Sequence, residues 1–330
     1  MPTGTPPDAT EHPSPPPPPS LPPLPPRPAD GHKGTFGTVG VIGGQAAGPH
    51  VMIGGPALSA LAALRAGCGL AVLAMPEPIL AAGLTIAPSA TGLALPVDAR
   101  RTLQPSDVAE LIDRYLPSFH CLAIGPGFGA DVAQQQIVIR LVAQDEHPLV
   151  IDADGINALA ASREFHRDFR SPAILTPHPG EYRRLAESLG LHHDPADEQD
   201  RPEAAADLAR RLGCVVVLKG RRTVTSDGVH SHINETGNVA LATAGTGDVL
   251  TGVIAGLVAQ FHKRPLGIGS RQITAGQQGG LSLYDCARLG VHLHGLAGDH
   301  WQSRNGNAGL LAEDLIEDLP AALYRTPRQS

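Results

Sequence analysis

Residues Ala242-Thr-Ala-Gly-Thr-Gly-Asp-Val-Leu250 combine small side chains with one carboxylate directly before an apolar stretch. The small residues let the backbone pass close to a ligand. The free amides at a helix start, where aligned dipoles leave roughly half a positive charge, favour an anion. A carboxylate beside an anion site is unfavourable unless it acts as a base. We therefore predict that Asp248 is a catalytic base, the alternative being a helix cap with no further role.

The segment Thr176-Pro-His-Pro-Gly-Glu181 follows a predicted strand, and its prolines and glycine restrict the backbone around two polar side chains. No other ligands have matching spacing, which disfavours a zinc site. Two interpretations stay open. Glu181 binds hydrated Mg²⁺ or positions a phosphate while His178 meets the substrate, or the segment is a rigid turn in which Glu181 caps the next helix.

Two further strand ends carry polar residues. Asp152, Asp154 and Asn157 lack the remaining ligands of a calcium loop, so we expect Asp152 to cap the following helix and the other two to line a cleft. The segment Lys219-Gly-Arg-Arg-Thr223 carries three cations, which suit the phosphate or ribose of a nucleotide. The alternative for this segment is a solvated turn.

The elements that must position these motifs alternate between short apolar runs and amphipathic stretches from about residue 36 onward. Continuous apolar runs are typical of strands covered on both faces, and the alternation predicts a largely parallel sheet with helices on both sides. Ligands of such sheets bind at the carboxyl ends of the strands, where these motifs lie. The predicted strands are Thr38–Ile42, Leu70–Met75, Cys121–Ile124, Leu149–Asp152, Ala173–Thr176 and Val215–Lys219.

After Lys219 the pattern changes. Asp227-Gly228 predicts a hairpin between residues 223–226 and 229–233. Residues 249–260 are apolar all round, which indicates a buried helix, and Gly252 and Gly256 would let another element approach it closely. Further helices are expected over residues 55–66, 281–300 and 309–323, and a loop insertion over residues 263–280.

Composition excludes several classes of protein. The chain has 330 residues, a net charge of −7 and no long basic block, which disfavours nucleic acid as a partner. No apolar run reaches the length of a membrane helix. The four cysteines are scattered without a CxxC pair, as in a reducing compartment, so we expect a cytoplasmic protein.

Residues 1–30 contain 14 of the 32 prolines and few residues that could fill a core. Such a segment cannot offset its ordering entropy by burial, so we predict a disordered or polyproline II tail followed by one domain over residues 31–330. A passive tail is favoured over one that binds a partner domain.

Taken in order, the motifs resemble those of the ADP-dependent NAD(P)H-hydrate dehydratase family, a branch of the ribokinase-like superfamily. The resemblance implies a three-layer α/β/α domain with a mainly parallel central sheet. It rests on His32-Lys-Gly34, Gly43-Gly44, the stretch 57–67, Gly125-Pro-Gly127, Asp152-Ala-Asp154 with Asn157, Thr176-Pro-His-Pro-Gly-Glu181, Lys219-Gly220 with Thr223, Gly237-Asn238, Gly245-Thr-Gly-Asp-Val-Leu-Thr-Gly252 and His294-Gly-Leu-Ala-Gly-Asp299.

The resemblance also implies the reaction: the S-form of NADHX or NADPHX, the hydrate of NADH or NADPH, is dehydrated at the expense of ADP, with AMP and phosphate released. Asp248 would be the base at the hydrate hydroxyl, and Glu181 would organise Mg²⁺ or phosphate. Contacts to the hydrate would come from Gly55, Gly127 and His178, and contacts to ADP or AMP from Lys219, Gly220, Arg221, Arg222, Thr223 and Gly247.

The chain departs from the family pattern at three places. Gly55 replaces a usual alanine, Ala244 replaces a usual glycine, and the insertion over residues 263–280 is longer than usual. Many relatives carry a fused epimerase domain where this chain has its Pro-rich segment, so we expect a separate NAD(P)HX epimerase as functional partner. The resemblance further implies a homo-oligomer, a tetramer in the family, and favours ADP over ATP.

Two alternatives remain at this point. A kinase of the same fold would phosphorylate a vitamin-precursor alcohol and stop there. A non-catalytic nucleotide-binding protein would bind without turnover, although the carboxylate of Asp248 and its flanking glycines oppose that interpretation.

Overall fold

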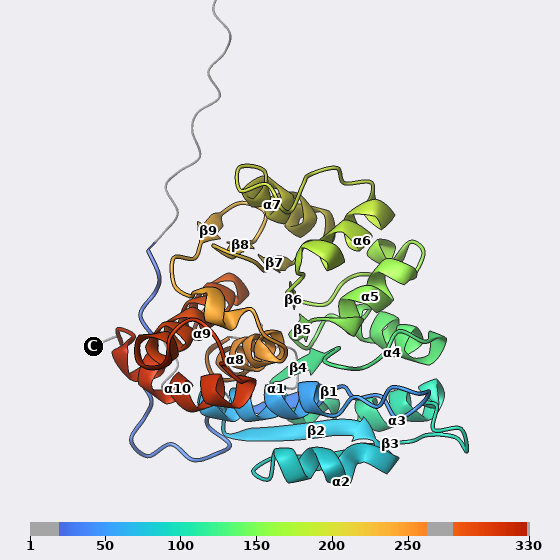
Figure 1. Ribbon diagram of the computed structural model, residues 1–330. Helices are drawn as coiled ribbons and strands as arrows, with labels where there is room; N and C mark the ends of the chain where they lie inside the picture. The colour runs from blue at the N-terminus through green and yellow to red at the C-terminus, as the bar shows by residue number, and fades with distance from the viewer. Residues whose placement is uncertain (1–19, 263–279, 329–330) are drawn as a thin grey trace, which may run out of the picture.

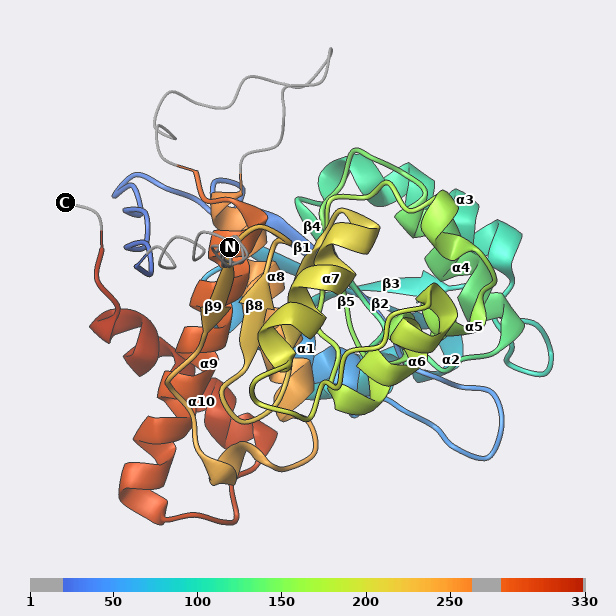
Figure 2. The same ribbon diagram turned by 90° about the horizontal axis from the view of Figure 1, so that it is seen from above.

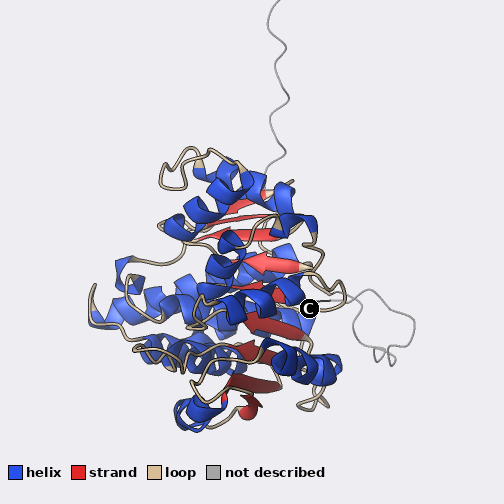
Figure 3. Cartoon of the chain, turned by 90° about the vertical axis from the view of Figure 1, so that its right-hand side faces the viewer, coloured by secondary structure: helices blue, strands red, loops and turns tan. Residues whose placement is uncertain are grey.

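A nine-stranded sheet lies between two layers of helices in the part of the chain that the computed structural model describes, residues 20–262 and 280–328 (Figures 1 and 3). Its strand order is β3-β2-β1-β4-β5-β6-β7-β8-β9. Strands β1 to β7 are parallel, and β8 and β9 pair antiparallel. The three-layer arrangement and the mainly parallel sheet agree with the prediction from sequence.

The elements follow the predicted strands and helices closely. The strands are β1 (Thr38–Ile42), β2 (Leu70–Pro76), β3 (Thr91–Leu95), β4 (Cys121–Ile124), β5 (Leu149–Ile151), β6 (Ala173–Leu175), β7 (Val215–Leu218), β8 (Val224–Ser226) and β9 (Ser231–Ile233). The helices are α1 (Gly54–Arg65), α2 (Glu77–Ile86), α3 (Pro105–Tyr115), α4 (Val132–Val142), α5 (Asp154–Ala161), α6 (Pro179–Leu189), α7 (Arg201–Leu212), α8 (Thr246–Phe261), α9 (Leu283–Asn305) and α10 (Ala312–Arg325).

Alternate residues of each strand face two separate cores. In β4, Cys121 and Ala123 pack with α1, α8, α9 and α10, whereas Leu122 and Ile124 pack with α3 to α7. All four side chains are fully buried, which explains why the strand reads as a continuous apolar run. Figure 2 shows α8, α9 and α10 on one side of the sheet and α3, α4, α5 and α6 on the other.

The strand order reverses between β1 and β4, which lie side by side although three α-helices and two strands separate them in the chain. The glycine turns after these strands touch, because the Gly44 amide donates to the Pro126 carbonyl at 3.1 Å. A Cβ atom on Gly43 would lie 2.3 Å from the same carbonyl oxygen, so only glycine fits there. Open parallel sheets bind ligands at such a reversal.

Helix α8 is buried along its length and crosses α1 closely, as its glycines predicted. A Cβ atom on Gly252 would lie 2.1 Å from the Ser59 carbonyl oxygen, and one on Gly256 would lie 2.8 Å from that of Ala63. This close contact holds α8, which carries Asp248, against the helix that carries Gly55.

The edge strand β3 was not predicted from sequence. Its residues are mostly exposed and include a glycine, so they lack the apolar run that identified the other strands. The predicted hairpin is confirmed as β8 and β9. No helix among the described residues has the length and apolar composition needed to cross a membrane.

Residues 20–30, the described part of the predicted tail, pack against the domain. Leu24 is buried and its amide donates to the Pro327 carbonyl at 2.8 Å. The Arg27 guanidinium lies 3.6 Å from the centre of the Phe36 ring and donates to the Gly67 carbonyl. The expectation of an unpacked tail is not met for these residues. Residues 1–19 and all but the last residue of the predicted insertion at 263–280 lie outside the described residues.

Replacing Gly252 with alanine tests the contact between α8 and α1. A methyl group has no space beside the Ser59 carbonyl, so we expect the free energy of unfolding to fall by about 1–3 kcal/mol, measured by denaturant titration. Gly54→Ala is the matched control, because a Cβ atom there meets nothing within 4 Å, and it should stay within about 1 kcal/mol of the wild type. Equal stabilities for the two variants would contradict the packing.

Candidate active site

Asp248 lies in the first turn of α8 but does not cap it. The helix begins after Gly245, which has φ 89° and provides no side-chain cap. A Cβ atom on Gly55 would lie 3.1 Å from Oδ1 of Asp248, so the two predicted site residues face each other directly. A glycine at position 55 leaves the carboxylate open to a ligand where a larger side chain would cover it.

The surroundings of Asp248 make its carboxyl group a proton acceptor near neutral pH. Burial and the nearby Asp152 carboxylate raise the pKa of Asp248 to about 7, although Lys219 acts in the opposite direction. A base is most effective when its pKa lies near the working pH. The position and the pKa together match the role of base predicted for Asp248.

Lys219 is the cation of a buried charge cluster. Its Nζ lies 2.6 Å from Oδ1 of Asp152 and 3.8 Å from Oε2 of Glu181. The hydroxyl of Thr251 on α8 donates to Oδ2 of Asp152 at 2.7 Å. Burial alone would lower the pKa of Lys219, but Asp152 and Glu181 outweigh it, so the pKa is raised and the ammonium keeps its proton.

The cluster corrects the expectation for Asp152. Its carboxylate accepts from Lys219 and Thr251, and α5 begins without a side-chain cap. Ala153, between the two aspartates, has φ 49°, an uncommon value for a residue with a side chain. The Asp154 carboxylate accepts from the Gly129 amide at 2.8 Å, which ties the end of β5 to the glycine turn after β4.

His178 and Glu181 form a capping box at the start of α6. Nδ1 of His178 accepts from the amides of Gly180 and Glu181, and the Glu181 carboxylate accepts from the His178 amide at 2.8 Å. Nε2 of His178 therefore carries the ring proton and lies 3.3 Å from Glu181. The rigid-turn interpretation is confirmed by these bonds, while contacts of His178 with substrate and of Glu181 with Mg²⁺ stay predictions.

The turn between β7 and β8 places part of the predicted nucleotide site beside α8. A Cβ atom on Gly247 would lie 3.7 Å from Nζ of Lys219, so these two residues are neighbours. The Thr223 hydroxyl donates to the Gly220 carbonyl at 3.0 Å and closes the turn. Arg221 and Arg222 are exposed, and among the described residues no hydrogen bond or ion pair joins their side chains to the Asp248 cluster.

Gly127 belongs to the same end of the sheet. It follows β4 with φ 55°, and a Cβ atom there would lie 3.0 Å from Cβ of Met52 and 3.8 Å from Pro56, the neighbour of Gly55. The fold thus brings the glycine predicted to contact the hydrate next to the start of α1. Of the residues predicted to contact the nucleotide, Arg221 and Arg222 are the two whose side chains do not lie with the Asp248 cluster in the described part of the chain.

Sequence reasoning missed two residues of α9 that support the site. Nε2 of His294 bonds to the Thr246 carbonyl at 2.8 Å, and burial lowers the pKa of His294 to about 4, so the ring is a neutral donor. The Asp299 carboxylate accepts from the Gly237 amide at 2.9 Å and from Nδ2 of Asn238 at 2.8 Å. Both side chains belong to the motif His294-Gly-Leu-Ala-Gly-Asp299, which carried part of the family resemblance but gave neither residue a role in the site.

The described residues contain no group of three His, Cys, Asp or Glu side chains that could hold a metal ion by themselves. Mg²⁺ commonly keeps several waters and is bound through one or two carboxylates together with substrate phosphates. Glu181 and Asp152 are the carboxylates closest to the predicted nucleotide side of the site, around Lys219.

Comparison with known proteins decides the family. The family model of NAD(P)H-hydrate dehydratase matches residues 39–321. The chain belongs to the NAD(P)H-hydrate dehydratase family. It is similar to the bifunctional NAD(P)H-hydrate repair enzyme Nnr of Moorella thermoacetica, with 37% identity over 82% of this chain and 47% of that protein. The chain thus spans about half the length of the curated relatives it matches.

Solved structures agree with this family. The ADP/ATP-dependent NAD(P)H-hydrate dehydratase of Bacillus subtilis, co-crystallised with ATP and Mg²⁺, has a TM-score of 0.68 and 29% identity, covering 92% of this chain and 94% of that one. A ribokinase-like superfamily protein of Enterococcus faecalis has a TM-score of 0.68 and 24% identity, covering 93% of each chain. The predicted ribokinase-like fold is confirmed.

Replacing Lys219 with methionine removes the cation of the cluster and leaves buried carboxylates without a partner. We expect the free energy of unfolding at neutral pH to fall by about 3–5 kcal/mol. Adding Asp152→Asn should recover part of that loss in a double-mutant cycle. Arg140→Met, which breaks an ion pair more than half exposed, should cost no more than about 1 kcal/mol. Strict additivity of Lys219→Met and Asp152→Asn would contradict the buried pair.

Proposed function

We propose that the chain dehydrates the S-form of NADHX or NADPHX to NADH or NADPH, using ADP and releasing AMP and phosphate. The observation that carries this proposal is the Asp248 carboxyl, with a pKa of about 7, at the anion-binding start of α8 and facing Gly55. Family membership supports the dehydratase over a kinase of the same fold that would stop at a phosphorylated product.

The co-substrate is a nucleotide carrying Mg²⁺, which the related Bacillus subtilis structure supports because it was co-crystallised with ATP and Mg²⁺. Lys219, Gly247 and the turn that ends at Thr223 would face its phosphates. Glu181 or Asp152 would hold the metal, which neutralises charge on the phosphoryl group when bound. The family resemblance favours ADP over ATP.

The reaction needs a base because a hydroxyl is a weak nucleophile until its proton is removed. It needs a phosphoryl donor because a hydroxyl is a poor leaving group and a phosphate is a good one. Asp248 takes the proton of the hydrate hydroxyl, whose oxygen then bonds to the terminal phosphorus of ADP while the bond from that phosphorus to AMP breaks. Phosphate then leaves the ring carbon, and loss of the neighbouring proton restores the double bond of the nicotinamide. The free amides at the start of α8 stabilise the charge of the phosphoryl group in transfer.

Residues 31–330 are the proposed extent of the dehydratase domain, and the family resemblance supports a homo-oligomer. The cytoplasmic location and the separate epimerase stay predictions.

The direct test follows absorbance at 340 nm with the purified protein, hydrated NADH, Mg²⁺ and either ADP or ATP. We expect nucleotide-dependent recovery of absorbance, reduced by about 10²–10⁴-fold in Asp248→Asn, since the variant keeps the shape and loses the base. The Asp113→Asn variant is the control, because it makes the same change in an exposed carboxylate on α3 that has no part in the site. No recovery with either nucleotide would contradict the proposed function, and a stable phosphorylated product would favour the kinase.

A further inference from the structure

Arg201 is a buried cation, and none of the ion pairs within 4 Å among the described residues joins it to a carboxylate, although the charge of Glu198 acts on it from a greater distance. It is the first residue of α7 and only 5% exposed. Its Nη2 donates to the carbonyl oxygens of Leu218 and Lys219, both at 3.1 Å, and its Nη1 donates to that of Arg221. Burial lowers the pKa of Arg201. The hydrogen bonds of Nη1 and Nη2 thus all go to the backbone of β7 and of the turn that follows it, while Nε is buried without a partner among the described residues.

These bonds fix which way the peptide groups of the turn point. In a trans peptide the carbonyl and the amide point in opposite directions, so the amides of Gly220 and Arg222 are directed away from Arg201. Within residues 20–262 and 280–328, neither amide donates a hydrogen bond. Unpaired backbone amides on one side of a turn form a site that suits an anion.

The conformation of the turn depends on the same guanidinium. Gly220 has φ 146°, and a Cβ atom there would lie 2.7 Å from Nη2 of Arg201. Arg222 has φ 55°, an uncommon value outside glycine. The Lys219 amide donates to the Pro177 carbonyl at 2.8 Å, which fixes the other side of the turn to the segment before α6.

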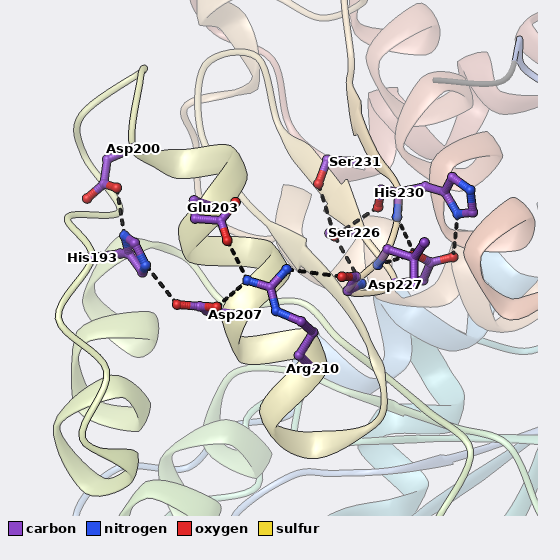
Figure 4. Close-up of polar contacts among 11 residues, drawn as sticks. His193, Asp200, Glu203, Asp207, Arg210, Ser226, Asp227, His230 and Ser231 are labelled. Atoms are coloured by element: carbon purple, nitrogen blue, oxygen red, sulfur yellow. Dashed lines mark hydrogen bonds and ion pairs between the residues drawn. The ribbon is translucent and has the colours of Figure 1, made fainter. Parts of the chain in front are cut away.

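Contacts of His193 hold helix α7, and with it Arg201, in a fixed position. The His193 ring lies between two carboxylates, at 2.7 Å from Asp200 and 2.7 Å from Asp207, which fastens the segment before α7 to the helix (Figure 4). The hydrogen bond to Asp200 raises the pKa of His193, which favours the charged ring that can donate to both carboxylates. Arg210, at the other end of α7, bonds to Asp207 and donates to the Gly228 carbonyl at 3.1 Å, so it holds the turn between β8 and β9 and not the turn that Arg201 holds.

We infer that Arg201 is a positioning residue for nucleotide binding: it holds the turn Lys219–Thr223 with the Gly220 and Arg222 amides presented to a phosphate group of the nucleotide. The inference rests on the proposed function, because that function supplies the nucleotide. It assigns a role to a residue that makes no contact with substrate and whose charge acts through the peptide groups of the turn.

The test compares Arg201→Met and Arg201→Lys with Arg210→Met, the matched control, because Arg210 lies on the same helix and supports the hairpin turn at Gly228. Amide hydrogen exchange of the free protein is followed by NMR, and KM for ADP and kcat are measured with hydrated NADH. We expect the Lys219 amide to lose protection in both Arg201 variants. KM for ADP should rise about tenfold, the effect of losing one or two phosphate contacts, with kcat changing much less. The lysine variant should be the milder of the two.

Gly220→Ala is a second variant, which keeps the Arg201 guanidinium but places a methyl group 2.7 Å from its Nη2. This clash should displace the turn, so KM for ADP should rise as in the Arg201 variants. Unchanged protection of the Lys219 amide in Arg201→Met, or an unchanged KM for ADP in both Arg201→Met and Gly220→Ala, would overturn the inference. So would equal effects in Arg210→Met. If the wild-type protein shows no nucleotide-dependent turnover, the proposed function fails, and the exchange of the free protein still decides whether Arg201 positions the turn.

Discussion

The ion pair between Lys219 and Asp152 is the contact on which the site depends. It joins the end of β7 to the end of β5, and the Thr251 hydroxyl extends it to α8. One ammonium serves a group of carboxylates, Glu181 and Asp248 among them, so negative charge remains in excess. That excess, together with burial, keeps the pKa of Asp248 high enough for the carboxyl group to exchange a proton near neutral pH.

Helices outside the site hold its backbone by bonds to carbonyl and amide groups. His294 and Asp299 of α9 bond to the segment that leads into α8, and Arg201 of α7 bonds to the turn after β7. Each support is a buried or partly buried side chain, so the turns that face the ligand need few bonds of their own and can present free amides.

Much of the fold could be predicted, because the strands at the centre are buried on both faces and read as continuous apolar runs. The place of Asp248 at a helix start could be predicted as well, since the small residues and the carboxylate lie within a few positions of each other; its role as the base stays a prediction. The pairing of Asp152 with Lys219 could not, because 67 positions separate the two and their meeting depends on the register of three parallel strands. Arg201 also escaped prediction, since an arginine in the first turn of a helix is normally exposed.

The most direct test of this account is a carboxyl NMR titration of Asp248 in the wild-type protein and in Lys219→Met. We predict a pKa of about 7 in the wild type, and a higher pKa in the variant because Lys219 stabilises the ionised form. A pKa near the ordinary value for an aspartate, or one that Lys219→Met leaves unchanged, would contradict the claim that this buried charge cluster prepares Asp248 as the base.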